Sequence, residues 1–422
     1  MHKTTRCTTI LFSLILLSIP SFSGSIPTAK PEEVGLSAER LQRIHDLMQR
    51  YMDAGNFTGS VTIVARRGRI AHFEAQGVMD LETKRPMAKD AIFRIMSMTK
   101  PVVGVSVLML IEEGKIRLND PVSKFIPQFK DLKVAMVQPA QPPPPYSPPG
   151  AQASEPRSYT VPADREITVR DLLTHTSGLL SGAASMKEAA KVALKKGETL
   201  SDWIPRLATL PLDFQPGTRW AYSAQAGFDT LARIVEITSG LPFDQFARRR
   251  IFDPLGMKDT CFYPAESAAP RIVTLYRKSP NGFEKQTNPS FMNGVYLSGG
   301  GGLFSTAEDY LQFAQMLVNG GQLSGKRLLS PRTVELMGSV FVPDTLPGRN
   351  RGEGYGLSVR VVSDSSAAGT MLSNGTFGWS GAFGTHFWVD QKEKIAAILM
   401  TQTSGWDIDF DFETAVMQAL TE

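Results

Sequence analysis

The sequence "FRIMSMTKPV", residues 93–102, places Ser97 and Lys100 three positions apart and follows them directly with Pro101. Proline is tolerated in the first turn of a helix, where backbone N–H groups have no intrahelical partner, so Pro101 predicts a helix that begins close to Ser97. Residues three apart share a helix face, which puts Lys100 beside the Ser97 hydroxyl at the positive end of that helix. The stretch therefore predicts a serine nucleophile with a lysine as its activating partner.

An S-x-x-K pattern alone is weak, because ordinary composition yields roughly one chance match in a chain of this length. This chain holds a single such pattern, and other serine-hydrolase layouts fit it less well. There is no G-x-S-x-G nucleophile elbow, and "GWSGA" at 378–382 resembles one only superficially. His175 and His386 are lone histidines, which are usually structural, and no H-E-x-x-H or cysteine cluster indicates a metal site.

Composition limits the class of protein. A chain of 422 residues, 42% of them hydrophobic, can bury a large core and is expected to form two packed domains. The net charge of +4, with 20% charged residues and no long basic run, gives no electrostatic argument for a nucleic-acid partner.

The first 23 residues resemble a secretory signal, with basic residues before the apolar run "ILFSLILLSI" and small residues at Ser21 and Ser23. The run is shorter than the about 20 apolar residues of a spanning helix, so we expect an exported periplasmic or extracellular protein without a stable membrane span. Cys7 lies inside the signal, which leaves Cys261 alone and predicts no intrachain disulfide. An uncleaved anchor is the alternative.

Strand patterns lie at both ends of the mature chain. "GSVTIVA" and "IAHFEAQG" predict a hairpin turning at Arg67 and Gly68, and "GTHFWVD" and "KIAAILMTQ" predict a second strand pair. Helices are expected from about Ser37 and at the C-terminus. Between the strand patterns the chain is mostly helical, with helices that end at Gly114, at Gly240 and before Pro254. We therefore expect a discontinuous α/β domain, 24–92 and 285–422, around a helical domain, 93–284.

Residues 138–156, "QPAQPPPPYSPPGAQASEP", are too rich in proline for a regular helix or a central strand. A surface loop or polyproline spacer is the favoured interpretation over a ligand for a proline-binding module.

Five motifs in the expected order resemble the serine beta-lactamase and penicillin-recognising hydrolase superfamily, in its class C-like branch. They are "SMTKP", "GKIRLNDPVSKF", "ITVRDLLTHTSGL", "PGTRWAYSAQAGFDTLARIVE" and "GGGGLFSTAEDYLQF". The resemblance runs from about residue 31 to the C-terminus. It implies an antiparallel sheet flanked by helices, with an inserted all-helical domain and an active site in the cleft between the two.

The resemblance also implies roles for individual residues. Ser97 would be the acylated nucleophile, Lys100 its proton acceptor or electrostatic partner, and Tyr222, in a "Tyr-Ser-Ala" version of the family's Tyr-x-Asn, the phenol that carries protons to and from the leaving group. Ala224 replaces the asparagine that contacts the side-chain amide of a beta-lactam. The backbone amides of Ser97 and Ala382 would form the oxyanion hole, where side-chain identity does not matter.

The third family motif, usually Lys-Thr-Gly or His-Thr-Gly, aligns with Trp379, Ser380 and Gly381, which would line the substrate site. An indole cannot pair with a beta-lactam carboxylate as lysine does, but it can line an acyl or alcohol pocket. This tryptophan form resembles the family VIII carboxylesterases and related acyltransferases.

The expected activity is cleavage of a small-molecule ester through an acyl-enzyme, without a metal or an organic cofactor. Three alternatives stay open. The chain could be a beta-lactamase or D-amino-acid peptidase that acts on amides, an acyltransferase that uses an alcohol in place of water, or a non-catalytic penicillin-sensing module. The natural substrate and the oligomeric state cannot be inferred from the sequence.

Overall fold

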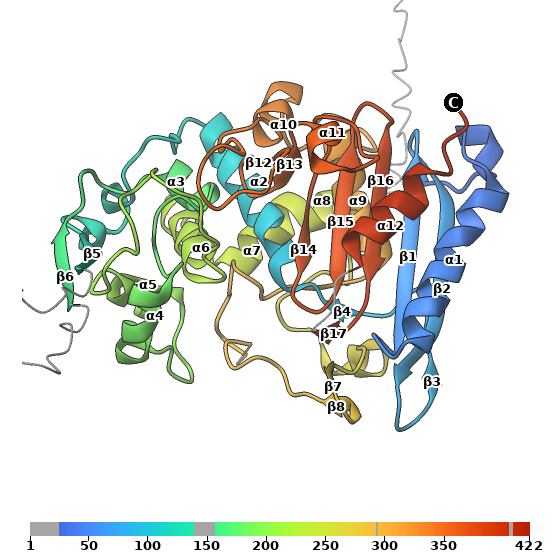
Figure 1. Ribbon diagram of the computed structural model, residues 1–422, viewed down its shortest axis with the longest axis horizontal. Helices are drawn as coiled ribbons and strands as arrows, with labels where there is room; N and C mark the ends of the chain where they lie inside the picture. Colours follow the sequence, from blue (N-terminus) through green and yellow to red (C-terminus); the bar gives the residue numbers. More distant parts are fainter. Residues whose placement is uncertain (1–24, 139–156, 293, 405–407) are drawn as a thin grey trace, which may run out of the picture.

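The computed structural model describes residues 25–138, 157–292, 294–404 and 408–422. Within these ranges an eight-stranded antiparallel sheet takes its strands from both ends of the chain, in the order β12-β13-β14-β15-β16-β1-β2-β3 (Figure 1). Its strands are β1 (Gly59–Arg66), β2 (Arg69–Asp80), β3 (Arg85–Pro86), β12 (Glu353–Tyr355), β13 (Arg360–Val362), β14 (Phe377–Gly381), β15 (Thr385–Asp390) and β16 (Ile395–Met400). The expected signal and residues 139–156 of the proline-rich segment lie outside the described residues.

The two predicted strand pairs meet at the centre of this sheet, where β1 pairs with β16 in a register that sets Ile63 opposite Ile398. The predicted hairpin between β1 and β2 turns at Arg67 and Gly68, which have φ of 52° and 73°. Positive φ at both central residues is the geometry that matches the twist of a two-residue hairpin. Both terminal segments of the chain are thereby joined in one sheet, as the sequence predicts.

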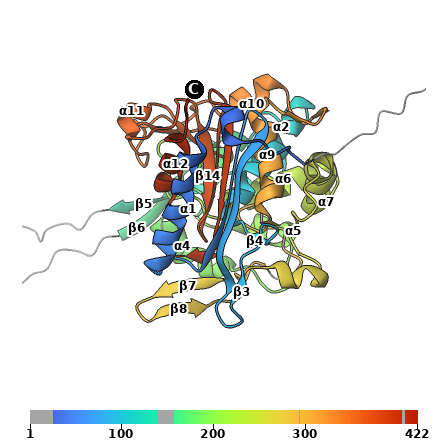
Figure 2. The same ribbon diagram turned by 90° about the vertical axis from the view of Figure 1, so that its right-hand side faces the viewer.

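Helices cover both faces of the sheet (Figure 2). On one face α1 (Ala38–Asp53) and α12 (Asp409–Met417) pack on alternate strand residues that include Val64, Ala397 and Leu399. On the other face α2 (Thr99–Glu112) and α9 (Ala307–Val318) join the core that contains Ile63 and Ile398. Strands buried on both faces read as continuous apolar runs, which explains the sequences of β1 and β16.

The middle of the chain forms a mostly helical part. Its helices are α3 (Val169–Leu173), α4 (Ala183–Glu188), α5 (Leu200–Leu207), α6 (Ala226–Ser239), α7 (Phe243–Ala247) and α8 (Asp253–Leu255). Of these, α3 to α6 lie on the left of Figure 1. The shorter helices of the C-terminal third are α10 (Pro331–Met337) and α11 (Ser365–Ala368). The boundaries expected for the two domains stay a prediction.

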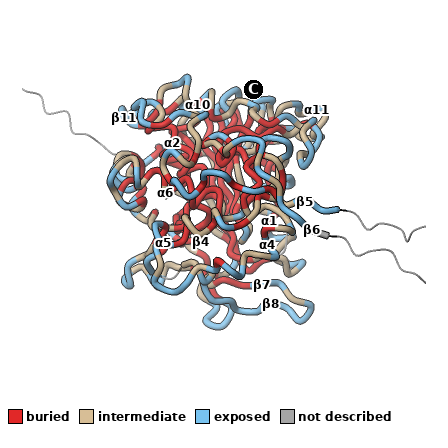
Figure 3. Tube along the Cα trace, turned by 90° about the vertical axis from the view of Figure 1, so that its left-hand side faces the viewer, coloured by how far each residue is buried: buried red, intermediate tan, exposed pale blue. Residues whose placement is uncertain are grey.

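Small strand pairs lie outside the main sheet. One pair, β5 (Lys133–Gln138) and β6 (Arg157–Pro162), flanks the proline-rich segment. A second pair is formed by β7 (Tyr276–Ser279) and β8 (Gly282–Lys285). Both pairs lie among the exposed segments of Figure 3. The remaining short strands are β4 (Phe93–Arg94), β9 (Phe304–Ser305), β10 (Gln322–Leu323), β11 (Lys326–Arg327) and β17 (Thr403–Ser404). The sequence patterns did not predict a hairpin within the helical region.

One helix end was predicted wrongly. The helical path after Pro242 does not stop before Pro254 but continues through a π-helical turn, Arg248–Phe252, into α8 and ends at Gly256, which has φ 74°. Pro254 lies in the first turn of α8, where a missing N–H is tolerated. The wider π turn before it replaces the regular α-helical hydrogen bonds that a proline would interrupt.

Candidate active site

Ser97 lies in a 3₁₀ turn, Met96–Met98, that leads directly into α2. Pro101 is the third residue of α2, so the prediction of a helix start near Ser97 is confirmed. Met96 has φ 47°, a left-handed conformation that a non-glycine residue rarely adopts and that persists only where its surroundings hold it. The half-buried Ser97 side chain is thus presented from a strained turn at the head of a buried helix.

Lys100 Nζ lies 3.0 Å from Ser97 Oγ, and the lysine is fully buried. The amine also donates to the carbonyl oxygens of Ala224, at 2.6 Å, and Gly300, at 2.7 Å. These three acceptors account for the three donors of an ammonium group. The backbone of position 224 therefore holds the lysine, in addition to the substrate contact that we expect near its side chain.

Tyr222 donates its phenolic hydrogen to Ser97 Oγ at 2.6 Å. Lys100 Nζ also lies 4.9 Å from the centre of the Tyr222 ring, which places the lysine charge beside the phenol. The structure thus brings together the three side chains that the sequence assigns to nucleophile, base and proton carrier. A serine hydroxyl within hydrogen-bond reach of two proton-exchanging groups is the arrangement of an activated nucleophile.

Two residues that sequence reasoning missed hold this arrangement in place. Gly300, whose carbonyl accepts from Lys100, donates its own N–H to the carboxylate of Asp229 at 2.7 Å. Asp229 on α6 is fully buried and also accepts from Tyr296, at 2.7 Å, and Ser298, at 2.9 Å. Burial raises the pKa of the Asp229 carboxyl, and these hydrogen bonds oppose that rise. Asp229 is separated from Gly300 by 71 positions, so no local pattern could pair them.

The hairpin that carries the third motif lies against the turn of Ser97. Thr385 on β15 donates its side-chain hydroxyl to the carbonyl of Ile95 at 3.1 Å, and the turn contacts β14. Ala382, the residue directly after β14, is exposed. The amides of Ser97 and Ala382 are therefore carried by segments that pack together, and their oxyanion role stays a prediction.

Trp379 and Ser380 differ in their surroundings. The Trp379 ring is half-buried and lies 5.6 Å from the Tyr222 ring and 5.2 Å from the Tyr355 ring. Its buried Nε1 has no hydrogen-bond partner among the described residues. The Ser380 hydroxyl, in contrast, contacts His386 Nδ1 at 2.9 Å and donates to the carboxylate of Asp409 on α12. Position 379 thus presents an uncharged aromatic surface next to the Tyr222 ring.

The two lone histidines are both buried. His386 lies between Ser380, Asp409 and Glu413, and although burial lowers its pKa, the two carboxylates raise the pKa above its ordinary value. His175 packs against Tyr222 with ring centres 4.7 Å apart. Across the ranges that the structure describes, no group of three or more His, Cys, Asp or Glu side chains is arranged so that it could hold a metal ion. None of the helices in these ranges has the length and apolar character of a membrane-spanning segment.

Comparison with known proteins agrees with this geometry. The family described as Beta-lactamase matches residues 44–421. Protein Rv1367c of Mycobacterium tuberculosis is 35% identical, over 86% of this chain and 90% of that protein. Esterase EstB of Burkholderia gladioli is 30% identical, over 90% of this chain and 93% of that protein. The solved structure of EstCE1, described as a hydrolase with promiscuous acyltransferase activity, shares 26% identity with a TM-score of 0.74, covering 91% of this chain and 99% of that one.

The family match spans most of the chain, and the relatives resemble it over nearly their whole length. Tyr222 and the buried Lys100 both contact the Ser97 hydroxyl, which is the arrangement that the resemblance of the sequence to this superfamily implies. The chain therefore belongs to the beta-lactamase family and is a serine hydrolase of that family.

Proposed function

We propose that this protein cleaves carboxylic esters through an acyl-enzyme on Ser97. The observation that carries the proposal is the convergence of Lys100 Nζ, at 3.0 Å, and the Tyr222 hydroxyl, at 2.6 Å, on one serine oxygen. The uncharged ring of Trp379 stands where a lactam-binding cation is expected, which favours a neutral ester over a substrate with a carboxylate.

The proposed reaction has two steps. Ser97 Oγ attacks the ester carbonyl carbon while its proton passes to the Lys100–Tyr222 pair, which must first have lost one proton, and the amides of Ser97 and Ala382 hold the oxyanion. The carbon–oxygen bond to the alcohol breaks, and Tyr222 delivers a proton to the departing alcohol. Water then attacks the acyl-enzyme with the same groups in reverse, which releases a carboxylic acid and restores the Ser97 hydroxyl.

Tyr222 is the group placed to exchange the serine proton. All three hydrogens of a charged Lys100 already have acceptors, namely Ser97 Oγ and the carbonyls of Ala224 and Gly300. Lys100 in this state stabilises negative charge on the phenol beside it, at 4.9 Å from the ring centre. Loss of either side chain should therefore affect acylation.

Acyl transfer to an alcohol instead of water is a second candidate. It uses the same acyl-enzyme, and the promiscuous acyltransferase activity of the related hydrolase EstCE1 favours it. Adding a primary alcohol to an ester assay and measuring the new ester separates the two outcomes. A beta-lactamase or peptidase activity and a non-catalytic sensing role are the remaining alternatives.

The covalent step is tested with a fluorophosphonate probe and peptide mapping. We expect one adduct on Ser97, no labelling of Ser97→Ala, and full labelling of the control Ser366→Ala, which changes an exposed serine on α11. An adduct that maps to Ser380, or labelling that survives Ser97→Ala, would overturn the assignment. An acyl-enzyme that forms from an ester but never clears would favour the sensing role.

We also propose that the protein is exported and cleaved near Ser23, because the first 23 residues have the pattern of a secretory signal. Intact mass of the secreted protein tests this. A mature chain that begins after Ser23 is expected, and a mature chain that keeps residues 1–20 would favour a membrane anchor instead.

A further inference from the structure

Tyr222 lies in a segment without helix or strand, between the end of α5 at Leu207 and the start of α6 at Ala226. No regular backbone hydrogen bonding therefore fixes its position. The two residues that flank it in the chain both donate to one residue: Ala221 N–H donates to the His175 carbonyl at 3.1 Å, and Ser223 N–H donates to His175 Nδ1 at 3.2 Å. The His175 ring also packs on the phenol, with ring centres 4.7 Å apart. His175 thus holds Tyr222 from both sides and across its face.

The hydrogen bond from Ser223 determines the protonation state of His175. Because Nδ1 accepts, it carries no proton, and the proton of the neutral ring lies on Nε2. Burial, together with the nearby charges of Lys100 and Arg349, holds the pKa of His175 well below its ordinary value. The ring is therefore a neutral acceptor, whereas a protonated ring would present a donor to the Ser223 N–H and break the contact.

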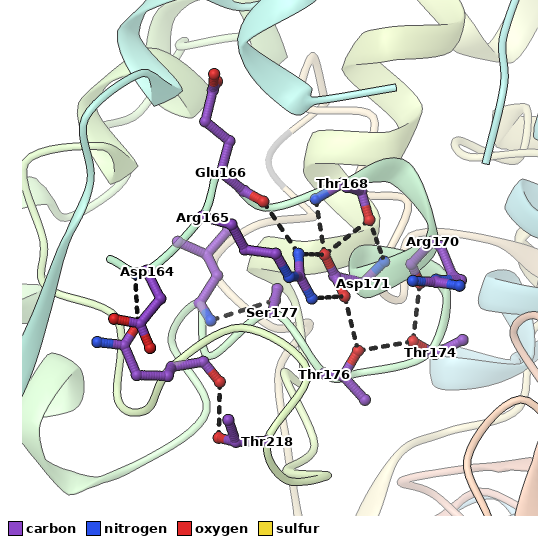
Figure 4. Close-up of polar contacts among 12 residues, drawn as sticks. Asp164, Arg165, Glu166, Thr168, Arg170, Asp171, Thr174, Thr176, Ser177 and Thr218 are labelled. Carbon is purple, nitrogen blue, oxygen red and sulfur yellow. Dashed lines mark hydrogen bonds and ion pairs between the residues drawn. The ribbon is translucent and has the colours of Figure 1, made fainter. Parts of the chain in front are cut away.

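The backbone of His175 is strained in the conformation that places this ring. His175 has φ 56°, in the left-handed region that non-glycine residues seldom occupy. Polar contacts on either side of it hold the turn (Figure 4). Asp171, only 2% exposed, accepts from Arg165 at 2.6 and 2.9 Å and from Thr176 at 3.2 Å, and Thr174 contacts Thr176 at 2.9 Å. The buried side chains of Asp171, Thr174 and Thr176, joined to the exposed Arg165, thus fix both neighbours of His175.

We propose that His175 is a positioning residue that sets the Tyr222 hydroxyl on Ser97. The proposal rests on the proposed function, in which Tyr222 exchanges protons with Ser97 and the leaving group. His175 does not touch the reacting atoms; it acts through the two backbone N–H groups beside Tyr222 and through ring packing. Its left-handed backbone and its Nδ1 acceptor are both required for that geometry.

The role predicts a dependence on the leaving group that a general loss of packing would not produce. Ethoxide is a poor leaving group and needs a proton from Tyr222 as the carbon–oxygen bond breaks. p-Nitrophenolate leaves without one. A variant with a misplaced Tyr222 should therefore lose more activity on ethyl butyrate than on p-nitrophenyl butyrate, with kcat reduced and KM nearly unchanged.

The test compares His175→Asn with His175→Gln. Asparagine tolerates positive φ and can place its carbonyl oxygen where Nδ1 accepts, whereas glutamine places its polar atoms farther out, toward the Nε2 position. We expect His175→Asn to stay within about fivefold of wild type in kcat. His175→Gln should lose about a hundredfold on ethyl butyrate and clearly less on p-nitrophenyl butyrate, as misplacement of a catalytic group by about 1 Å does.

His72→Asn is the matched control, because His72 on β2 contacts Thr62 at 2.7 Å within the sheet and none of the site residues. The rate of fluorophosphonate labelling at Ser97 is the second readout and needs no ester turnover. If the wild type labels but hydrolyses no ester, the proposed function fails while labelling rates still rank the His175 variants. The positioning role is overturned if His175→Asn is no more active than His175→Gln, which includes the case in which neither variant folds. It is also overturned if a variant loses activity on both esters by the same factor.

Discussion

Gly381 lies directly against the carbonyl oxygen of Ile95: a Cβ at position 381 would stand 2.3 Å from that oxygen and 2.2 Å from Thr385 Oγ1. Neither neighbour is the free end of a flexible side chain, because Thr385 itself donates to Ile95. Only glycine allows the end of β14 to approach the turn that presents Ser97. The glycine of the third motif therefore sets the distance between that hairpin and the nucleophile.

Gly381→Ala should lower kcat/KM for p-nitrophenyl butyrate by about a hundredfold or more, since the hairpin must move away from Ser97. Gly227→Ala is the control, because a Cβ there meets nothing closer than 3.5 Å. Alanine also favours the helix at that position. Full activity in Gly381→Ala with an unchanged melting temperature would show that the close approach is not needed.

Lys100→Ala should abolish fluorophosphonate labelling, with a loss of about 10² to 10⁴ in acylation rate, because the serine loses its activating partner. The control is Lys89→Ala, whose ammonium lies over the Phe73 ring in the sheet domain. Labelling and ester turnover that stay within about tenfold, near 1.4 kcal/mol in barrier, would make Lys100 structural.

The Cys261 thiol should be nearly inert at neutral pH. Burial, with the nearby Asp259 and Asp309 carboxylates, raises its pKa to about 11. Only the thiolate reacts, so about one molecule in a thousand is reactive at pH 8 and the rate should rise roughly tenfold per pH unit toward pH 11. Iodoacetamide labelling followed by mass spectrometry measures this profile. Rapid labelling at pH 8 that does not increase with pH would contradict the raised pKa.

The sequence predicts the sheet and a candidate nucleophile because their signals are local. Ser97, Lys100 and Pro101 lie within one helical turn. The strand patterns of β1 and β2 are separated only by Arg67 and Gly68, where the chain reverses direction. Tyr222 lies 125 positions from Ser97, so it was found through family resemblance rather than through spacing.

Other parts depend on tertiary contacts that no local pattern records. Lys100 is held by backbone carbonyls at positions 224 and 300, and a carbonyl carries no side-chain signature. The helix through Pro254 was predicted wrongly because a π turn before it changes the hydrogen-bond pattern. His175 looks like an ordinary buried histidine in the sequence, since the hydrogen bonds that join it to the Tyr222 segment come from backbone N–H groups.

Preference for esters over beta-lactams follows from two positions. Ala224 cannot make the amide contact of an asparagine, and Trp379 cannot pair with a lactam carboxylate. The lost hydrogen bond to the carboxylate costs about 1.5 to 3 kcal/mol and the lost neutral amide contact about 0.5 to 1.5 kcal/mol, so lactam turnover should fall about two to three orders of magnitude below that of a dedicated lactamase. A neutral ester has no carboxylate to leave unpaired. Trp379→Lys is the companion variant, and it should raise lactam turnover relative to ester turnover.

The most direct measurement compares kcat/KM for p-nitrophenyl butyrate and for nitrocefin on one preparation of the mature protein, with Ser97→Ala as the blank. We expect efficient ester hydrolysis that Ser97→Ala abolishes, and nitrocefin hydrolysis lower by about two orders of magnitude or more. Nitrocefin hydrolysis that matches or exceeds ester hydrolysis would contradict the esterase proposal and favour a beta-lactamase.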